Sequence, residues 1–594
     1  MSTTKSAVHE PIASNGATVN GTSNGPAIGV HRDAVEMTGS HITCRALESE
    51  GVDIVFGYPG GAVIPLYDAL PSAGFHHVLT RFEQWAALAA DGYARATGKV
   101  GVCIATSGPG ATNLVTGLAN SQLDSIPIVA ITGQVGQAFI GLDAFQETDI
   151  TGITLPITKH NYLVQSVEDI GPTIKEAFHL ARSGRPGPVL VDIPKNLFLA
   201  SAKYEAQPLA ERRGYQPTTI PNMRQVRTAA NLLNKAKRPL FMAGHGILIA
   251  AAEESFAKLV EQTGVPVIFT LLGQGSFPES HPLALGLMGM HGHRHVNKAL
   301  EECDLLINIG ARFDDRATGK VAEFATKAKV VHVDIDPAEI GKNIQTDVPV
   351  VGDARQVINV MLQEVEPRNH HEWMAWIDSQ RNVALEAALE DRPEWPEPYT
   401  IIKSLAGATN GEAIFTTDVG QHQMWAAQHL GLDFPNRWLT SGGLGTMGYG
   451  LPSAVGAKMG RPELEVWAIV GDGGFQMSLN ELATCVQERL DVKIAVINNG
   501  FLGMVRQWQD LFHAKNYSEV EILGPDFVKL AEAYGATGLR VTRGSEIMPT
   551  IQKARETKGT VVVDFVIEPE ANVWPIVPPG ASNSDMMLHR FEDH

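Results

Sequence analysis

Short apolar runs recur along the chain, and segments with helical periodicity separate them. Each run holds five to seven residues, a length that suits a strand better than an amphipathic helix. Their apolar residues are nearly continuous, so we expect strands buried on both faces, as in parallel sheets covered by helices. The runs form three groups: Val52–Tyr58, Val100–Thr106, Ile126–Thr132 and Pro188–Pro194; Pro239–Ala243, Pro266–Thr270, Leu305–Gly310 and Val330–Ile335; Ala413–Asp418, Val466–Val470, Lys493–Ile497 and Val561–Ile567.

This grouping predicts an α/β protein with three doubly wound parallel-sheet domains. The expected domain boundaries are 38–200, 223–365 and 399–570. The segments between and beyond them lack a strand or helix pattern of similar strength, because they are rich in Pro, charged residues or small polar residues. We expect a disordered tail at 1–37, a linker at 201–222, a charged helical segment that ends in a second linker at 366–398, and a C-terminal tail at 571–594.

The first and third groups share a local pattern. Ile104–Gly110 reads IATSGPG and Ile469–Gly473 reads IVGDG, and in both cases a glycine turn leads into a helix pattern and a further strand. Two explanations remain open. All α/β units share this pattern to some degree, or one domain is a duplicate of the other, in which case the two copies could face each other in a dimer.

Composition and charge exclude several classes of protein. The chain has 594 residues, and its 47 Lys and Arg against 65 Asp and Glu give a net charge of −18, which argues against binding to nucleic acid or an anionic membrane. Its four cysteines lie far apart without a CxxC pair, so neither a disulfide framework nor a structural zinc site is expected. No stretch of 18 apolar residues predicts a transmembrane helix.

The N-terminal tail bears on location. It lacks the apolar core of a signal peptide, and its first arginine is Arg32. We therefore expect a cytoplasmic protein. The alternative is a plastid or mitochondrial precursor, because the tail is rich in Ser and Thr and only weakly acidic.

The sharpest chemical signal is a GDG turn at 471–473 followed by a pair of asparagines at 498–499. Asp472 and Asn499 are separated by a turn, a helix and a return strand, so a right-handed crossover would bring them together at the carboxyl edge of one sheet. A carboxylate, an amide oxygen and a backbone carbonyl form an oxygen site that suits Mg²⁺ and phosphate. Gly473 and Gly474 would offer backbone N–H groups at a helix start, where a diphosphate is favoured.

The GDG turn followed by NN resembles the thiamine-diphosphate (ThDP) motif of that enzyme superfamily. Further motifs, from about residue 38 to 585, resemble the catalytic subunit of acetohydroxyacid synthase, also called acetolactate synthase. They are YPGGAVIPLYDAL (58–70), SGPGATN (107–113), GLDAFQE (141–147), ITKHNYLV (157–164), RPGPVLVDIPK (185–195), GMHG (289–292), ARFDDRATGK (311–320), GQHQMWAAQ (420–428), GTMGYGLP (445–452) and VPPGAS (577–582).

The resemblance implies a fold of three domains, which bind in turn the ThDP pyrimidine, FAD and the ThDP diphosphate. It also implies an activity. Pyruvate would be decarboxylated on ThDP, and the two-carbon unit would be joined to pyruvate or 2-ketobutyrate in branched-chain amino-acid biosynthesis. The family further implies a homodimer or tetramer and a regulatory small subunit.

The resemblance assigns ThDP-site roles residue by residue. Glu83 would stabilise the imino form of the aminopyrimidine, although a glutamate at the first turn of a helix is also favoured by the helix dipole alone. Met447 would bend ThDP, and Phe145 and Gln146 would reach the site across a dimer. The remaining positions are Tyr58, Pro59, Gly60 and Gly61 near the pyrimidine, Gln421, His422, Gly473, Gly474 and Met477 near the diphosphate, and Asp472, Asn499 and the carbonyl of Phe501 on Mg²⁺.

The resemblance also assigns a flavin site and a substrate site. Arg316 would hold a 2-keto acid carboxylate, or it is a surface ion pair with Asp314 or Asp315; Trp508 would wall the acceptor pocket, or it is ordinary core. The histidines at 291, 293 and 295 have a period of two that is a poor match for zinc, so His291 is interpreted as a flavin neighbour. The FAD positions are Arg185, Gly244, Gly246, Thr270, Met290, His291, Gly310, Arg312, Asp314, Asp334, Ile335 and Asp353.

Two alternatives to the synthase remain. One is a related ThDP enzyme with a different acceptor, such as a FAD-free catabolic acetolactate synthase or a pyruvate oxidase. The other is a non-catalytic relative, against which the intact set of Glu83, Asp472 and Asn499 argues. The chain departs from the family at Phe82 and Trp85, where a histidine and a small residue are usual. At 3.6 residues per turn, Trp85 should point away from Glu83.

Overall fold

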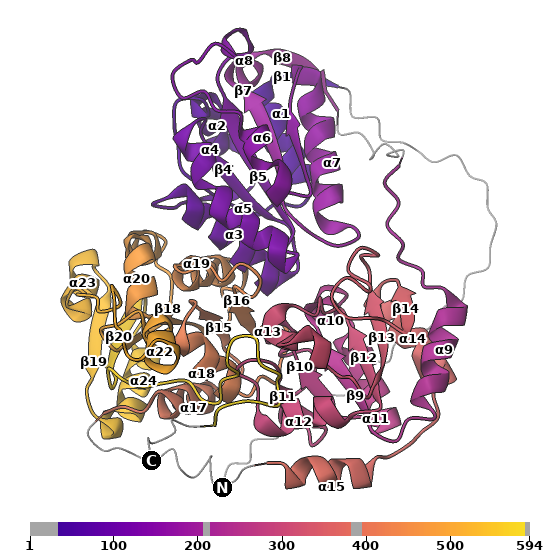
Figure 1. Ribbon diagram of the computed structural model, residues 1–594. Helices are drawn as coiled ribbons and strands as arrows, with labels where there is room; N and C mark the ends of the chain where they lie inside the picture. Colours follow the sequence, from indigo (N-terminus) through magenta and orange to yellow (C-terminus); the bar gives the residue numbers. More distant parts are fainter. Residues whose placement is uncertain (1–33, 206–213, 382–394, 589–594) are drawn as a thin grey trace, which may run out of the picture.

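Three six-stranded parallel sheets organise the chain (Figure 1). The computed structural model describes residues 34–205, 214–381 and 395–588. Each sheet has helices on both faces, as the continuous apolar runs predict, and the predicted α/β class is confirmed. Every predicted run coincides with a strand, to within one or two residues at each end.

The first unit has the strand order β3-β2-β4-β5-β7-β6. It contains β2 (Ile54–Gly57), β3 (His76–Leu79), β4 (Gly101–Ala105), β5 (Ile128–Gln134), β6 (His160–Leu163) and β7 (Val189–Pro194), with α1 (Gly39–Ser49), α2 (Ile64–Ala69), α3 (Glu83–Thr97), α5 (Val115–Asp124) and α7 (Ile170–Arg182) among its helices. β4, β5 and β7 are buried at every residue, because helices cover both faces of the sheet.

The third unit has the order β16-β15-β17-β18-β20-β19. Numbered within each unit, both orders are 2-1-3-4-6-5, which agrees with the repeated local pattern in the sequence. The unit contains β15 (Ile414–Thr417), β16 (Trp438–Thr440), β17 (Val466–Gly471), β18 (Val492–Asn498), β19 (Thr537–Val541) and β20 (Val561–Val566), with α17 (Pro398–Thr409), α18 (Gln421–His429), α19 (Gly450–Gly460), α20 (Asp472–Ser478), α21 (Leu482–Gln487), α22 (Gly503–Phe512), α23 (Phe527–Tyr534) and α24 (Ile547–Glu556).

The middle unit has a different order, β11-β10-β9-β12-β13-β14, or 3-2-1-4-5-6 within the unit. This is the order of dinucleotide-binding folds, whose ligands lie where the strand order reverses. The strands are β9 (Pro239–Ala243), β10 (Val267–Phe269), β11 (Ala284–Leu287), β12 (Leu305–Ile309), β13 (Lys329–Asp334) and β14 (Val348–Val351); the helices include α9 (Met223–Leu233), α10 (His245–Ile249), α11 (Glu253–Thr263), α12 (Arg294–Glu302), α13 (Asp315–Thr318), α14 (Ala354–Glu364) and α15 (His371–Ser379).

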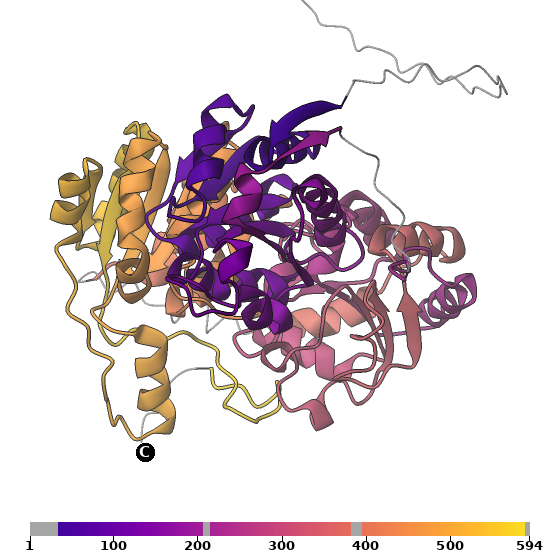
Figure 2. The same cartoon turned by 90° about the horizontal axis from the view of Figure 1, so that it is seen from above.

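The first unit lies across the junction of the other two, as Figure 2 shows from above. Its closest contact with the third unit is between α3 and α19, where glycines let the two backbones touch. A Cβ on Gly92 would lie 2.2 Å from the carbonyl oxygen of Ser453, and one on Gly456 would lie 1.8 Å from that of Ala89. No larger residue fits at either position without separating the helices.

The segments outside the sheets differ in part from expectation. β1 (Val35–Thr38) pairs antiparallel with β8 (Ser201–Tyr204), so the end of the expected tail and the start of the expected linker form a small sheet. The local apolar pattern there is weak, and long-range pairing supplies the structure. Residues 1–33, 206–213, 382–394 and 589–594 lie outside the described part of the chain.

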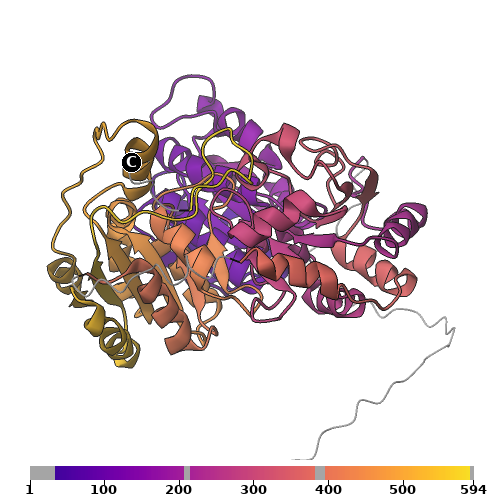
Figure 3. The ribbon, with the colours of Figure 1, turned by 60° about the horizontal axis from the view of Figure 1, so that its bottom comes forward.

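The C-terminal segment after β20 is irregular but well anchored. Figure 3 shows it crossing from the third unit towards the middle one. The N–H of Val577 donates to the carbonyl of Met290 at 2.9 Å, and the N–H of Lys320 donates to the carbonyl of Ala581 at 3.0 Å. Among the helices in the described ranges, none is long and apolar enough to cross a membrane.

Candidate active site

Asp472 and Asn499 meet at the carboxyl edge of the third sheet, as their spacing predicts. β17 and β18 are parallel neighbours; Asp472 directly follows the last residue of β17, and Asn499 directly follows the last residue of β18. The N–H of Gly500 donates to Asp472 Oδ2 at 3.0 Å, and the N–H of Phe501 donates to Asn499 Oδ1 at 3.1 Å. Burial raises the pKa of Asp472 to about 7, so a cation beside it would stabilise its charged form.

A second set of polar groups surrounds the same edge. Gln421 begins α18, and its Nε2 donates to Gln507 Oε1 at 2.9 Å and to the carbonyl of Ala571 at 2.8 Å. The His422 ring is buried, its Nε2 has no partner within the described residues, and burial lowers its pKa to about 3. A neutral, buried imidazole with an unpaired nitrogen is a group that a bound ligand would satisfy.

Asp418 is a functional candidate that the sequence reasoning did not single out. It follows β15 at the same edge, it is fully buried, and burial raises its pKa to about 7. Its Oδ1 accepts from the N–H groups of Val419 and Gly448, both at 2.8 Å, whereas Oδ2 is without a partner in the described part of the chain. The available signal was its position at the end of a predicted strand, and in the structure it directly follows β15 as Asp472 directly follows β17.

Side chains leave little space around Gly473 and Gly474 at the start of α20. A Cβ on Gly474 would lie 2.4 Å from Asp418 Oδ2, and one on Gly473 would lie 2.7 Å from Leu502 Cδ2 and 3.9 Å from Met447 Cε. Met447 therefore faces the GDG turn. Met477, in contrast, is 49% exposed, and its Cβ lies near Gly448.

The first unit gathers its own predicted residues into a separate cluster. Glu83 is the first residue of α3 and is buried; Asn113 Nδ2 donates to its Oε2 at 2.9 Å. Gly110 lies beside its other oxygen, where a Cβ would be 3.2 Å from Oε1. Gly60 packs on Thr106, and Gly108 packs on the backbone of Gln146, whose φ is +61°.

The outer members of this cluster are strongly exposed. Phe145 is 89% exposed and Tyr58 is 40% exposed, and Leu142 beside them is 68% exposed. Pro59 and Gly61 belong to the same turn after β2 and are also open to solvent. Apolar side chains at this level of exposure mark a surface that another surface is expected to cover.

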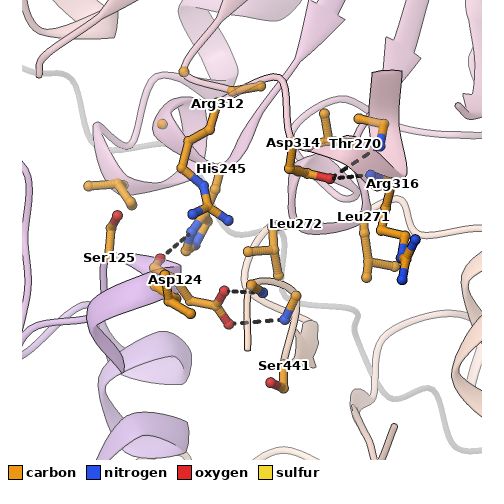
Figure 4. A pocket seen from close by; sticks show the side chains of 18 of the residues that line it. Asp124, Ser125, His245, Thr270, Leu271, Leu272, Arg312, Asp314, Arg316 and Ser441 are labelled. Atoms are coloured by element: carbon orange, nitrogen blue, oxygen red, sulfur yellow. Dashed lines mark hydrogen bonds between the residues drawn. The ribbon is translucent and has the colours of Figure 1, made fainter. Parts of the chain in front are cut away.

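A large cavity lies between the middle unit, the third unit and the end of α5 (Figure 4). Its volume of about 910 Å³ is within the range of cofactor pockets. It is lined by the predicted flavin positions Arg185, Gly246, Thr270, Met290, His291, Gly310, Arg312, Asp314, Asp334, Ile335 and Asp353, and also by Arg316, Met447 and Trp508. Glu83, Tyr58, Phe145 and Gln146 do not line it.

Gly244 lies just beneath this cavity, at the strand-order reversal between β9 and β12. A Cβ there would be 2.3 Å from the carbonyl oxygen of Gly310, and one on Gly246 would be 2.7 Å from the Gly310 Cα. These three glycines let two strand ends and α10 approach closely. The result is a glycine-lined floor at the place where dinucleotides bind in folds of this strand order.

Comparison with known proteins decides the family. Family models for thiamine pyrophosphate enzymes match in order along the chain: the N-terminal TPP binding domain at residues 37–153, the central domain at 226–361 and the C-terminal TPP binding domain at 418–565. The chain is 50% identical over 570 residues to an acetolactate synthase of Mycobacterium bovis, covering 93% of this chain and 92% of the relative. The chain belongs to the acetolactate synthase family of thiamine pyrophosphate enzymes.

Other members of the acetolactate synthase family are similarly close. An acetolactate synthase large subunit of Corynebacterium glutamicum is 50% identical over 562 residues, with 93% of this chain and 90% of the relative covered. A probable acetolactate synthase large subunit of Methanocaldococcus jannaschii is 46% identical over 558 residues, with 92% and 94% covered. The family that the sequence motifs suggested is therefore confirmed.

Arg316 and Trp508 lie together in the lining of the cavity. The Arg316 guanidinium carbon lies 5.9 Å from the centroid of the Trp508 ring, and Arg316 Nη1 lies 3.3 Å from Asp315 Oδ2. Arg316 thus forms a surface ion pair with Asp315 and also lines the cavity, and its role in holding a 2-keto acid carboxylate stays a prediction. Trp508 is half-buried on α22 and is part of the cavity wall rather than core alone.

Several predicted flavin residues already have partners within the protein. Arg185 Nη1 pairs with Asp336 at 3.1 Å and Glu339 at 2.7 Å, which leaves it less suited to a phosphate than expected. Asp314 and Asp353 are N-caps of α13 and α14. The structure gives these three side chains structural roles, and their cofactor roles stay predictions.

The histidines at 291, 293 and 295 favour the neutral form. His293 and His295 stack with their ring centroids 5.6 Å apart, and burial lowers the pKa of His291 and His293 to about 4 and that of His295 to about 3. Within the described ranges, no three His, Cys, Asp or Glu side chains gather as metal ligands. The predicted Mg²⁺ site is of a different kind, because it combines one carboxylate with an amide and a carbonyl oxygen.

Proposed function

We propose that the chain decarboxylates pyruvate with ThDP and Mg²⁺ and transfers the remaining two-carbon unit to pyruvate or 2-ketobutyrate. The products would be 2-acetolactate and 2-aceto-2-hydroxybutyrate, as needed for valine, leucine and isoleucine synthesis. The observation that carries the proposal is the meeting of Asp472 and Asn499 at a glycine-lined sheet edge. The acetolactate synthase names of its relatives support the reaction.

The residues present fit a diphosphate and a divalent cation. Asp472, Asn499 and the carbonyl of Phe501 would hold Mg²⁺, and the start of α20 would bind the diphosphate. The unpaired Nε2 of His422 and Oδ2 of Asp418 are buried polar atoms that a ligand at this edge would satisfy. Bound ThDP would supply the nucleophilic carbon that the reaction requires.

The protein's own groups would then control geometry and protons. Glu83, buried and fixed by Asn113, would hold a proton at the cofactor's pyrimidine ring. Arg316 would orient the carboxylate of the incoming 2-keto acid, and Trp508 would enclose its alkyl group. Met447, facing Gly473, would define the space between the rings of the cofactor.

We further propose that FAD occupies the 910 Å³ cavity. Its position at the strand-order reversal and the close packing of Gly244, Gly246 and Gly310 support a dinucleotide there. Decarboxylation and ligation need no external electron acceptor, so we expect a yellow protein whose flavin is not reduced during turnover. A strict requirement for oxygen or a quinone would indicate the pyruvate oxidase alternative.

A homodimer, or a tetramer built from such dimers, is the assembly we propose. Glu83 lies outside the cavity that Met447 lines, and the exposed Phe145 and Leu142 stand next to Glu83's cluster. A second copy covering this surface would bring Glu83 to the partner's cofactor. Sedimentation should show a dimer that Phe145→Asp weakens; an unchanged dimer would contradict this interface.

The direct test is an acetolactate assay on the purified chain. Pyruvate, ThDP, Mg²⁺ and FAD should give acetolactate without an electron acceptor, whereas acetate formation would indicate an oxidase and full activity without FAD a catabolic synthase. Because relatives are named large subunits, the assay should be repeated with a candidate small subunit and valine. Cytoplasmic location stays a prediction.

A further inference from the structure

One loop serves both the cavity and the GDG turn. Residues 441–447, here called the wedge loop, connect β16 to the turn before α19, and its members from Ser441 to Gly445 line the cavity together with Met447. Three of its residues are glycines, and Gly445 has a φ of +72°. Such a loop has many accessible conformations, so holding Met447 in place requires contacts from outside the loop.

Asp124, at the end of α5 in the first unit, holds the start of the wedge loop. Its Oδ2 accepts from the N–H of Gly442 at 3.1 Å, and its Oδ1 accepts from the N–H of Gly443 at 2.6 Å (Figure 4). Asp124 is buried, with 2% of the residue exposed. Its backbone carbonyl lies 3.1 Å from Nδ1 of His245 in the middle unit. Asp124 therefore contacts all three units of the fold.

Arg95 on α3 holds Asp124 in this position. Its Nη2 donates to Asp124 Oδ2 at 2.7 Å, its Nε to Asp91 Oδ1 at 2.6 Å, and its Nη1 to the carbonyl of Thr440 at 3.0 Å. The arginine and both carboxylates are buried. A buried cation between two carboxylates, with further hydrogen bonds, fixes all of its partners.

Both ends of the wedge loop are held by hydrogen bonds to α3 and α5. Asn120 Oδ1 on α5 accepts from Ser441 Oγ at 2.6 Å and from Thr446 Oγ1 at 3.0 Å. Tyr449, just after the loop, donates from its hydroxyl to Asp91 at 2.8 Å. Polar groups of the first unit thus hold the chain by hydrogen bonds on both sides of Met447.

We propose that Asp124, fixed by Arg95, is a positioning residue that sets the wedge loop and through it Met447. The proposal rests on the proposed role of Met447 in shaping the ThDP site. It adds that this role depends on two buried residues of another unit, Asp124 and Arg95. Their hydrogen bonds run to the wedge loop, Asp91 and Thr440, and Asp124 also lines the cavity proposed for FAD. Loosening the loop should then impair turnover while the diphosphate and Mg²⁺ contacts stay intact.

The test is Asp124→Asn, which keeps the size of the side chain but removes its charge and one of its acceptors. We expect kcat to fall about tenfold or more, since this is a modest misplacement of a positioning group. The pyruvate KM and the ThDP dissociation constant, measured by titration calorimetry, should change less than about threefold. Ser441→Ala removes the hydrogen bond from the wedge loop to Asn120 and should also lower kcat. This variant tests the proposal if Asp124→Asn does not fold.

A matched control is Lys493→Met. Lys493, near the start of β18, is likewise a buried cation. Its Nζ donates to Asp491 Oδ1 and to the carbonyls of Thr557 and Gly559, far from Asn499, which follows the other end of that strand. Its loss should lower the melting temperature without changing kcat per bound ThDP. If Asp124→Asn behaves like this control, Asp124 is only structural and the proposal is overturned.

A double-mutant cycle separates this proposal from the role of Met447 itself. If Asp124 acts through Met447, then Asp124→Asn combined with Met447→Ala should lower kcat no further than Met447→Ala alone. Multiplicative losses in the double variant would overturn the proposal while leaving the role of Met447 intact. Full activity of Met447→Ala would refute that role and the positioning of Met447 with it.

Discussion

Replacing Trp508 by leucine should change the choice of the second substrate. Trp508 lines the cavity from α22 and touches the Arg316 guanidinium, whose carbon lies 5.9 Å from the ring centroid. A flat aromatic wall can contact the extra methyl group by which 2-ketobutyrate exceeds pyruvate. In an apolar pocket such a group is worth roughly 1–3 kcal/mol, and tenfold in rate corresponds to about 1.4 kcal/mol.

Trp508→Leu is expected to have two effects, which differ in the acceptor substrates that they concern. Loss of the Arg316–ring contact affects both acceptors alike; Arg316 is 64% exposed, so this contact is worth about 0.5–1 kcal/mol, or roughly two- to fivefold. Loss of the methyl contact affects 2-ketobutyrate alone. Trp508→Leu should therefore lower the preference for 2-ketobutyrate over pyruvate about tenfold or more, while acetolactate is still formed.

The assay is competition between the two acceptors in one reaction, with the ratio of the two products measured. Phe512→Leu is a matched control, since Phe512 lies one turn further along α22 and its ring is 5.6 Å from that of Trp508. The control should leave the product ratio within about twofold. An unchanged ratio in Trp508→Leu would show that Trp508 is only core and would refute the reasoning.

Three further predictions concern the cofactor sites and pH. Asp472→Ala should abolish ThDP retention in calorimetry without unfolding the chain; normal ThDP affinity would exclude the metal assignment. Glu83→Gln should leave ThDP binding largely intact but lower kcat by about 100-fold or more, whereas a raised KM with unchanged kcat would contradict its role. Burial raises the pKa of Glu481 from 4.5 to about 7, so between these values the folded chain binds the extra proton and stability falls as pH rises. Glu481→Gln should therefore raise the melting temperature relative to the parent more at pH 8 than at pH 5, and equal shifts at both pH values would refute the assignment.

The strand predictions divide by position in the sheets. The predicted runs correspond to the four inner strands of each sheet, which are covered on both faces and are therefore continuous in apolar residues. The unpredicted strands are the two edges of each sheet. His160–Leu163, for example, is half-buried throughout, and Thr537–Val541 is buried only at its last residue. Edge strands have one pairing partner and partial cover, so their sequences carry little pattern.

The candidate site divides in a similar way. Asp472 and Asn499 could be paired from the sequence, because strand order and crossover handedness place strand ends at one edge. The ion pairs of Arg185 with Asp336 and Glu339 could not, since they join residues about 150 positions apart in two different units. The hydrogen bonds between Asp124 and the wedge loop likewise join residues far apart in the sequence. Local patterns fix strand ends, whereas contacts between units depend on the packed arrangement.

Phe82 and Trp85, which stand where a histidine and a small residue are expected, pack at the contact between the first and third units. Trp85 is buried, its Nε1 donates to Asn480 Oδ1 of the third unit at 3.2 Å, and its ring stands edge-on to that of Phe82 with centroids 5.7 Å apart. A Cβ on Gly448 would lie 2.9 Å from the Trp85 ring, so the glycine there makes room for it. The Glu83 carboxylate points elsewhere, to Asn113 within the first unit. The bulky Trp85 side chain therefore packs at the contact between two units and points away from the Glu83 carboxylate, as its position about 200° around the helix from Glu83 predicts.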